Sequence, residues 1–81
     1  MIKILFFGRL SDAAQPMSCE LPIEVSTVGE LSQWLGQRDE TLNEALSAKG
    51  NRIALNQAIC DENAVVKDGD EIAFMSPLSG G

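Results

Sequence analysis

Histidine and tyrosine are absent from this chain of 81 residues, and cysteine occurs only twice, at Cys19 and Cys60. Without histidine, a Ser-His-Asp triad cannot form and a zinc site loses its usual nitrogen ligands. The two cysteines make no CxxC pair, and such cysteines in a cytoplasmic protein are usually reduced and buried, although sequence alone leaves a disulfide open. The sequence therefore predicts no metal site, no bound cofactor and no enzyme acting on its own.

Long apolar stretches are also lacking. The longest run, residues 4–7, has the length of a strand and falls far short of the roughly 20 residues that cross a membrane. A signal peptide needs a longer apolar segment and a cleavage site, and the first residues supply neither. We therefore expect a cytoplasmic protein without a membrane segment, built as one domain with a small core and no deep cleft.

Basic residues are scarce, because six Lys and Arg stand against twelve Asp and Glu, which gives a net charge of −6. Such a domain is repelled by phosphate backbones, so nucleic acid is not an expected partner. A protein with a basic docking surface would be attracted to it. The charge is equally consistent with a simple role in solubility.

Alternation of apolar residues over residues 1–8 predicts a first strand that is apolar on both faces, as in the centre of a sheet. Periodicity and turn residues divide the rest of the chain into further elements. In order, they are a polar connection at 11–16 with one helical turn, an edge strand at 17–25 that contains Pro22, a helix from 28 to 37 or 38, a short helix from 39 that ends at Gly50, a strand at 51–55, a turn at 56–57, a strand at 58–60, a loop at 61–70 and a last strand at 71–75.

The start of the longer helix carries a specific signal. Thr27 and Glu30 have the spacing of a capping box, in which each side chain accepts a hydrogen bond from the backbone amide of the other residue. Val28, Leu31 and Leu35 then follow at helical spacing. This pattern predicts an amphipathic helix whose apolar side packs on the sheet.

Two strands, a helical region and three further strands describe an α+β domain, with a mixed sheet of about five strands and helices on one face. The helical crossover makes the first and last strands parallel neighbours. This arrangement is the β-grasp, or ubiquitin-like, fold. Residues 1–76 are predicted to form it, and residues 77–81 to form a flexible, extended C-terminal tail.

The tail itself is the most informative segment, and it reads Pro77-Leu78-Ser79-Gly80-Gly81. Pro77 opposes helix formation, and five extended residues reach roughly 15–18 Å. Because the last two residues carry no side chains, such a tail can enter a narrow channel in a partner. Its carboxylate becomes reactive only after an enzyme activates it, most simply with ATP, and a sulfur nucleophile would then give a thiocarboxylate. The alternative is a disordered terminus without function.

An apolar patch is predicted at the root of the tail. If the first and last strands are parallel, Phe7 and Met75 lie at the same end of the outward face of the sheet, and Ile59 is expected to join them. Exposed patches of this kind usually mark docking sites. The alternative is that a loop covers Phe7 and Met75 and makes them part of the core.

Several segments together resemble the molybdopterin synthase small subunit family over essentially the whole chain. These segments are Met1-Ile2-Lys3-Ile4-Leu5-Phe6-Phe7-Gly8, the helix start at 27–31, Leu55-Asn56-Gln57, and residues 68–74 leading to Leu78-Ser79-Gly80-Gly81. The chain departs from the family at Met75 and Ser76, because the family usually carries a second aromatic residue and a Pro-Pro pair before the tail. A flexible, apolar Met75 still suits a docking pocket, and Ser76 is expected to loosen the tail slightly.

The resemblance implies a sulfur carrier of molybdenum cofactor biosynthesis. An E1-like adenylyltransferase would use ATP to adenylate Gly81, which would then carry a covalent thiocarboxylate. The tail would insert into the large, catalytic subunit of molybdopterin synthase through Pro77, Leu78, Ser79 and Gly80. Sulfur would pass there to cyclic pyranopterin monophosphate, and two small and two large subunits would form a heterotetramer.

Three other functions stay open. A sulfur carrier for thiamine thiazole synthesis would share the fold and the Gly-Gly end, although such carriers are typically shorter and lack part of residues 38–50. A ubiquitin-like modifier would be joined to lysines through Gly81. A plain binding module with an inert tail would tolerate the deletion of Gly81.

Overall fold

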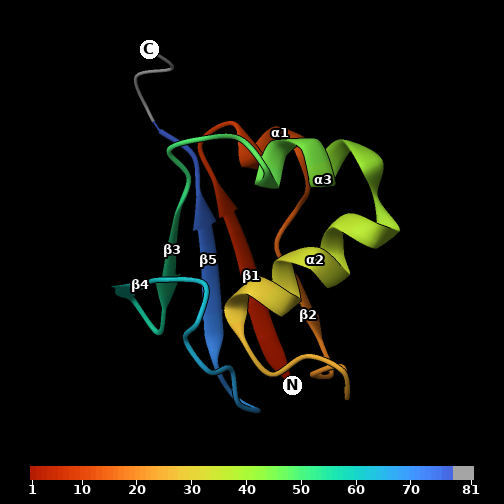
Figure 1. Cartoon of the computed structure of the whole chain (residues 1–81), viewed down its shortest axis with the longest axis vertical. Helices are drawn as coiled ribbons and strands as arrows, with labels where there is room; N and C mark the ends of the chain where they lie inside the picture. The colour runs from red at the N-terminus through yellow and green to blue at the C-terminus, as the bar shows by residue number, and fades with distance from the viewer. Residues whose placement is uncertain (78–81) are drawn as a thin grey trace.

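Five strands form one mixed sheet in the order β2-β1-β5-β3-β4 (Figure 1). In this computed structural model, which describes residues 1–77, they are β1 (Ile2–Phe7), β2 (Met17–Cys19), β3 (Arg52–Leu55), β4 (Ala58–Cys60) and β5 (Glu71–Met75). β1 and β5 lie side by side and parallel, whereas the other neighbouring pairs are antiparallel. The predicted β-grasp arrangement, with parallel first and last strands, is confirmed.

Three helices pack on one face of this sheet: α1 (Leu10–Ala13), α2 (Val28–Arg38) and α3 (Glu40–Leu46) (Figure 1). The predicted capping box begins α2, since Thr27 Oγ1 accepts a hydrogen bond from Glu30 N at 3.2 Å and Glu30 Oε1 accepts one from Thr27 N at 3.1 Å. Asp39 follows α2 and caps α3 by accepting a hydrogen bond from Leu42 N at 3.1 Å. Both helices therefore start where the sequence predicts.

The core lies between the central strands and α2. Ile4 and Ile72 are register partners on β1 and β5, and both are 0% exposed. Two residues further on, and therefore on the same face, the register partners Phe6 and Phe74 stack with ring centroids 5.9 Å apart. Burial of one such side chain contributes about 1.5–3 kcal/mol to stability. Because alternate residues of a strand point to opposite faces, this packing turns Phe7 and Met75 outward.

The second strand is shorter than predicted, because β2 ends at Cys19 instead of continuing to residue 25. The chain turns after Leu21, and the carbonyl of Pro22 accepts a hydrogen bond from Val25 N at 3.0 Å. Proline lacks the amide that a strand needs to continue its ladder. As predicted, β2 is an edge strand.

The predicted end of α3 at Gly50 is also wrong. The helix ends at Leu46, and Asn51 Nδ2 donates hydrogen bonds to the carbonyls of Ala45 at 2.8 Å and Leu46 at 3.2 Å. These carbonyls are the acceptors that a helix end leaves without partners. Gly50 adopts a φ of +87° in the turn that leads to β3, so its conformational freedom is used after the helix and not at its end.

Cys19 and Cys60 are free, half-buried thiols on β2 and β4, the two edge strands of the sheet. Four strand spacings of about 4.8 Å separate these edges, whereas a disulfide requires Cα atoms within about 7 Å. A disulfide between the two is therefore incompatible with this fold, and both thiols are only partly buried where the sequence suggested buried ones.

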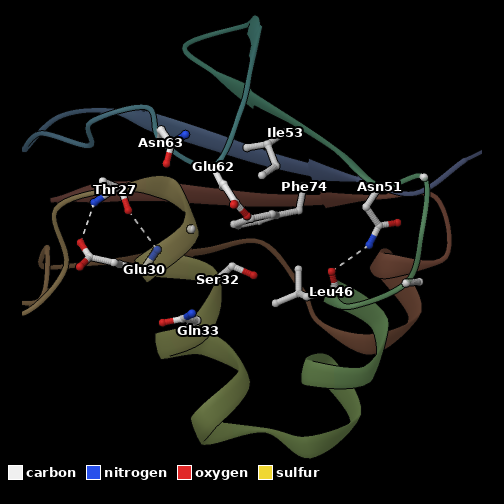
Figure 2. A pocket seen from close by; sticks show the side chains of 13 residues that line it. Thr27, Glu30, Ser32, Gln33, Leu46, Asn51, Ile53, Glu62, Asn63 and Phe74 are labelled. Carbon is white, nitrogen blue, oxygen red and sulfur yellow. Dashed lines mark hydrogen bonds between the residues drawn. The ribbon is translucent and has the colours of Figure 1, made fainter.

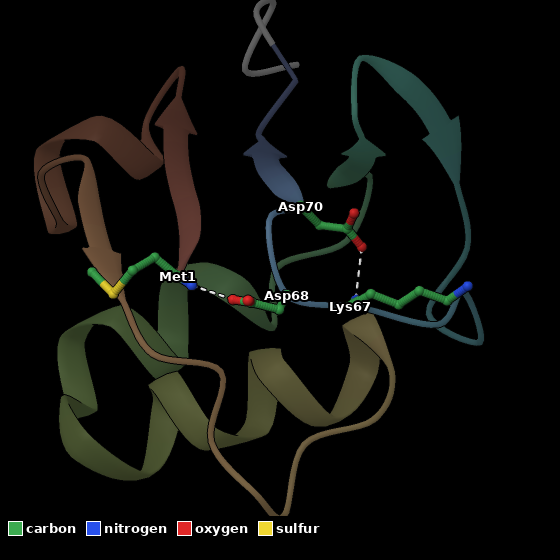
Figure 3. A network of polar contacts seen from close by, with 4 residues as sticks. All are labelled: Met1, Lys67, Asp68 and Asp70. Carbon is green, nitrogen blue, oxygen red and sulfur yellow. Dashed lines mark hydrogen bonds and ion pairs between the residues drawn. The ribbon is translucent and has the colours of Figure 1, made fainter.

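A polar network holds the end of the sheet at which β1 and β5 begin (Figure 3). Asp70 accepts hydrogen bonds from Lys67 N at 2.7 Å and from Asn56 Nδ2 at 3.0 Å, and the Met1 amino group pairs with Asp68. Asn56, in the predicted turn, has a φ of +51°. Chiefly because Asn56 and then Lys67 N donate to its carboxylate, the pKa of Asp70 is lowered.

Replacement of Asp70 by Asn tests this network. The lowered pKa means that ionised Asp70 stabilises the fold above its unfolded pKa near 4, and that this contribution is lost as the pH falls through the lower, folded value. Asp70→Asn should therefore reduce the free energy of unfolding at neutral pH by only about 0.5–1 kcal/mol, because solvent screens the contacts of this accessible carboxylate. It should also weaken the loss of stability below about pH 5.

Urea unfolding at a series of pH values measures both effects. Asp12→Asn, which makes the same change at an exposed position of α1, is the matched control. Identical acid profiles for wild type and Asp70→Asn would contradict the assignment.

Candidate functional site

The predicted site is the C-terminal tail, and the structure describes its root. Pro77 is described, whereas Leu78, Ser79, Gly80 and Gly81, predicted for tail insertion and for sulfur transfer, lie outside the described residues. Because β5 runs parallel to β1, the root of the tail leaves the sheet beside the end of β1. The surfaces that surround any reaction at the tail are therefore those near Phe7, Arg9 and Pro77.

Ser76 fastens the root of the tail to the end of β1. Its backbone N donates to the carbonyl of Phe7 at 3.3 Å, and its Oγ accepts a hydrogen bond from Arg9 N at 2.6 Å. Between these residues, Gly8 has a φ of +69°, and a Cβ added there would overlap Ser76 Oγ. The Ser76 hydroxyl occupies the space that Gly8 leaves and anchors the chain just before Pro77, whereas the expected loosening concerns the tail beyond it, which lies outside the described residues.

The three predicted docking residues lie together on the outward face of the sheet. Phe7 is 50% exposed, Ile59 is 62% exposed and Met75 is half-buried. With Leu5 and Ala73 they line a hollow of about 310 Å³. The alternative in which Phe7 and Met75 lie covered in the core is therefore wrong for this chain. We call Phe7, Ile59 and Met75 the apolar patch; it begins next to Ser76, since Phe7 is the register partner of Met75.

A different hollow of about 450 Å³ lies on the helix side, between α2, the end of α3 and β3 (Figure 2). Three of its polar residues have structural tasks. Thr27 and Glu30 form the capping box, and Asn51 Nδ2 binds the last carbonyls of α3. Ile53 and Phe74 give this hollow an apolar floor. The arrangement supports the fold and supplies no reactive pair.

Within residues 1–77, the structure gives little support for a nucleophilic side chain, and Cys60 is the example. Burial, and secondarily the carboxylate of Asp61, raises the pKa of the Cys60 thiol, so that it is protonated and weakly nucleophilic at neutral pH.

Within residues 1–77, no group of three or more His, Cys, Asp or Glu side chains is arranged to hold a metal ion. No helix in the described part of the chain has the length and apolarity needed to cross a bilayer.

Comparison with known proteins gives a consistent result. Residues 4–81 match the model of the ThiS family. The molybdopterin synthase sulfur carrier subunits of Escherichia coli and Haemophilus influenzae are 31% and 30% identical to the chain over 81 residues, and each match covers 100% of both chains. A chain in the solved complex of subunits 1 and 2 of the molybdopterin-converting factor from Helicobacter pylori matches with a TM-score of 0.70 and 30% identity, over 99% of this chain and 97% of that one. The fold and the resemblance seen in the sequence are confirmed.

The contact between Gly8 and Ser76 can be tested by a double-mutant cycle. Gly8→Ala should destabilise the fold by about 1–3 kcal/mol, because alanine is strained at this φ and its Cβ overlaps Ser76 Oγ. Ser76→Ala should cost about 1 kcal/mol through the lost hydrogen bond from Arg9 N. In the double variant, the overlap with Ser76 Oγ is gone. Its loss in the free energy of unfolding should therefore be smaller, by at least about 0.5 kcal/mol, than the sum of the losses in the two single variants.

Gly69→Ala is the matched control, since Gly69 also has a positive φ, of +91°, but a Cβ added there meets nothing within 4 Å. Its cost should add to that of Ser76→Ala without coupling. Chemical denaturation of the five variants measures all the terms, and strict additivity of Gly8→Ala and Ser76→Ala would disprove the contact.

Proposed function

Because the chain belongs to the ThiS family, we propose that it is a sulfur carrier of molybdopterin synthesis whose terminal residue, Gly81, accepts and donates the sulfur. The observation that carries this proposal is the full-length match to two molybdopterin synthase sulfur carrier subunits, which includes the Gly80-Gly81 end. A thiamine thiazole carrier would have the same chemistry. We favour molybdopterin, since the named relatives align over the whole chain, including the segment around α3 that thiazole carriers typically lack.

The proposed cycle uses partners for each chemical step. The Gly81 carboxylate attacks the α-phosphorus of ATP on an E1-like adenylyltransferase, forming an acyl adenylate and releasing pyrophosphate. A hydrosulfide equivalent then attacks the acyl carbon, so that a C–S bond replaces the C–O bond to AMP; AMP leaves, and Gly81 carries a thiocarboxylate. In the large subunit of molybdopterin synthase, the sulfur passes to cyclic pyranopterin monophosphate, and water restores the carboxylate. In this proposal the catalytic residues belong to the partners.

Two regions of the chain would meet the large subunit. The apolar patch would dock on its surface, since exposed apolar patches next to a functional segment are typical interface centres. Residues 77–81 would act as a separate tail on the 1–76 domain, with Pro77, Leu78, Ser79 and Gly80 inside the partner's channel. The complex of two subunits from Helicobacter pylori supports a partner of this kind. Assembly as a 2+2 heterotetramer, which rests on the family resemblance, and a cytoplasmic location complete the proposal.

The carrier function is tested by the intact mass of the protein after incubation with the adenylyltransferase, ATP and a sulfur source. We expect a gain equal to the replacement of one oxygen by sulfur, and no gain in a variant that lacks Gly81. Addition of the large subunit and cyclic pyranopterin monophosphate should return the protein to its starting mass. An isopeptide adduct in place of this gain would favour the modifier, and an unchanged mass with an active adenylyltransferase would refute the carrier.

Docking is tested by Phe7→Asp. A buried apolar centre of an interface typically contributes 2 kcal/mol or more, so the affinity for the large subunit should fall about 30-fold or more. Ile23→Asp is the matched control, because Ile23 is 99% exposed and lies beyond the edge strand β2. Titration calorimetry measures both variants, and equal losses of affinity would place the docking surface elsewhere.

A further inference from the structure

A second hollow opens beside the tail root, on the helix side of the sheet. It measures about 430 Å³ and lies between α1, the end of α3 and the residues that follow β5. Leu10, Ala45 and Pro77 contribute apolar surface to it. A Cβ added to Gly50 would lie 2.9 Å from Pro77 Cγ, so the turn before β3 packs directly on the root of the tail. Ser76 and Pro77 thus separate this hollow from the apolar patch.

The charge of this hollow is opposite to that of the whole protein. Arg9 and Lys49 are the charged residues among its described lining, which includes no Asp or Glu. Both are exposed, and within residues 1–77 neither has a carboxylate oxygen within 4 Å. The chain as a whole carries a net charge of −6. A local positive site therefore stands at the tail root of an acidic domain.

A third basic residue near the tail root, Arg52, has a different environment. It begins β3 as the register partner of Met75. However, it lines another hollow that also contains Asp61 and Glu62. Carboxylates of the same hollow therefore reduce the positive potential around Arg52. The positive potential around Arg9 and Lys49 is not reduced in this way. We call Arg9 and Lys49 the basic pair.

We infer that the basic pair binds carboxylate side chains that the large subunit carries beside the entrance of its tail channel. This inference rests on the proposed function. A partner that encloses the tail must close around Pro77, and Pro77 forms a wall of the hollow, so the partner surface at the entrance faces Arg9 and Lys49. Carboxylates are the protein groups that complement two adjacent cations, and the apolar wall accommodates their methylene groups.

The arrangement orients the encounter as well as holding the complex. An acidic domain is attracted by a basic partner surface, and the basic pair favours the one region of that surface that is acidic. The attraction of the acidic domain and the attraction of the basic pair act together only in the orientation that brings the tail to its channel. Charges at the rim of an interface act mainly on the association rate and on its salt dependence. The inference therefore concerns the rate at which the tail finds its channel.

The experiment measures association of the full-length protein with the purified large subunit by stopped-flow fluorescence. Lys49→Glu and, separately, Arg9→Glu should each lower the association rate constant about 5- to 10-fold at low ionic strength, with little change in the dissociation rate. The difference from wild type should shrink as the ionic strength rises past about 0.15 M. Lys67→Glu makes the same change of charge just before β5, at the opposite end of the sheet, and should stay within about twofold of wild type.

Each possible result either supports or overturns the role of the basic pair. Equal rates for wild type and Lys49→Glu, or equal slowing by Lys49→Glu and Lys67→Glu, would overturn the inference while leaving the sulfur carrier intact. A wild-type protein that does not bind the large subunit at all would refute the proposed function and the inference with it. Lys49→Gln, which removes the charge without reversing it, should show about half of the effect on a logarithmic scale and replaces Lys49→Glu if that variant does not fold.

Discussion

The parallel pairing of β1 with β5 is the constraint on which the rest of the structure depends. Five register pairs, from Lys3 with Glu71 to Phe7 with Met75, join the beginning of the chain to its end. One face of this pair supplies the centre of the core, and the other supplies most of the apolar patch. The pairing also decides where the tail begins, since β5 can leave the sheet only beside the end of β1. The fold, the apolar patch and the position of the tail root are therefore consequences of one register.

The two ends of this pair are closed by different chemistry. Where the strands begin, charged groups act, through the contacts of Asp70 and the pairing of Met1 with Asp68. Where the strands end, a neutral hydroxyl and a glycine act, because Ser76 occupies the space above Gly8. The hydrogen bonds of Ser76 do not depend on pH in the way that the hydrogen bonds of Asp70 do. As the pH falls, the contacts of Asp70 therefore weaken before the contacts that fix the root of the tail.

Much of this fold was predictable from local patterns. The alternation in residues 2–7 and 71–75 gave both central strands, and the spacing of Thr27 and Glu30 gave the start of α2. The errors occurred where tertiary contacts override local sequence. Apolar alternation continues past Cys19, yet the chain turns at Pro22, and α3 ends four residues before Gly50 because Asn51 reaches back to its last carbonyls. Neither contact leaves a periodic signal.

The candidate site was predictable to a different degree in each of its parts. Phe7 and Met75 followed from strand register, so the apolar patch could be placed before the structure was known. The role of Ser76 depends on the missing side chain of Gly8, which lies far away in the sequence. The basic pair likewise joins the residue that precedes α1 and a residue in the turn after α3, and only the packing of these helices makes them line one hollow. The assignment of sulfur to Gly81 came from family resemblance, because no pattern of spacing encodes it.

The parallel central strands also determine how the domain responds to mechanical force. The chain enters the sheet at the start of β1 and leaves it at the end of β5, so tension between its two ends runs along both strands in opposite directions. Such a load shears all the hydrogen bonds of the pair together instead of opening them one by one. Under the proposed function, a partner that draws the tail into a narrow channel would load the domain along this shear direction whenever the start of β1 is held.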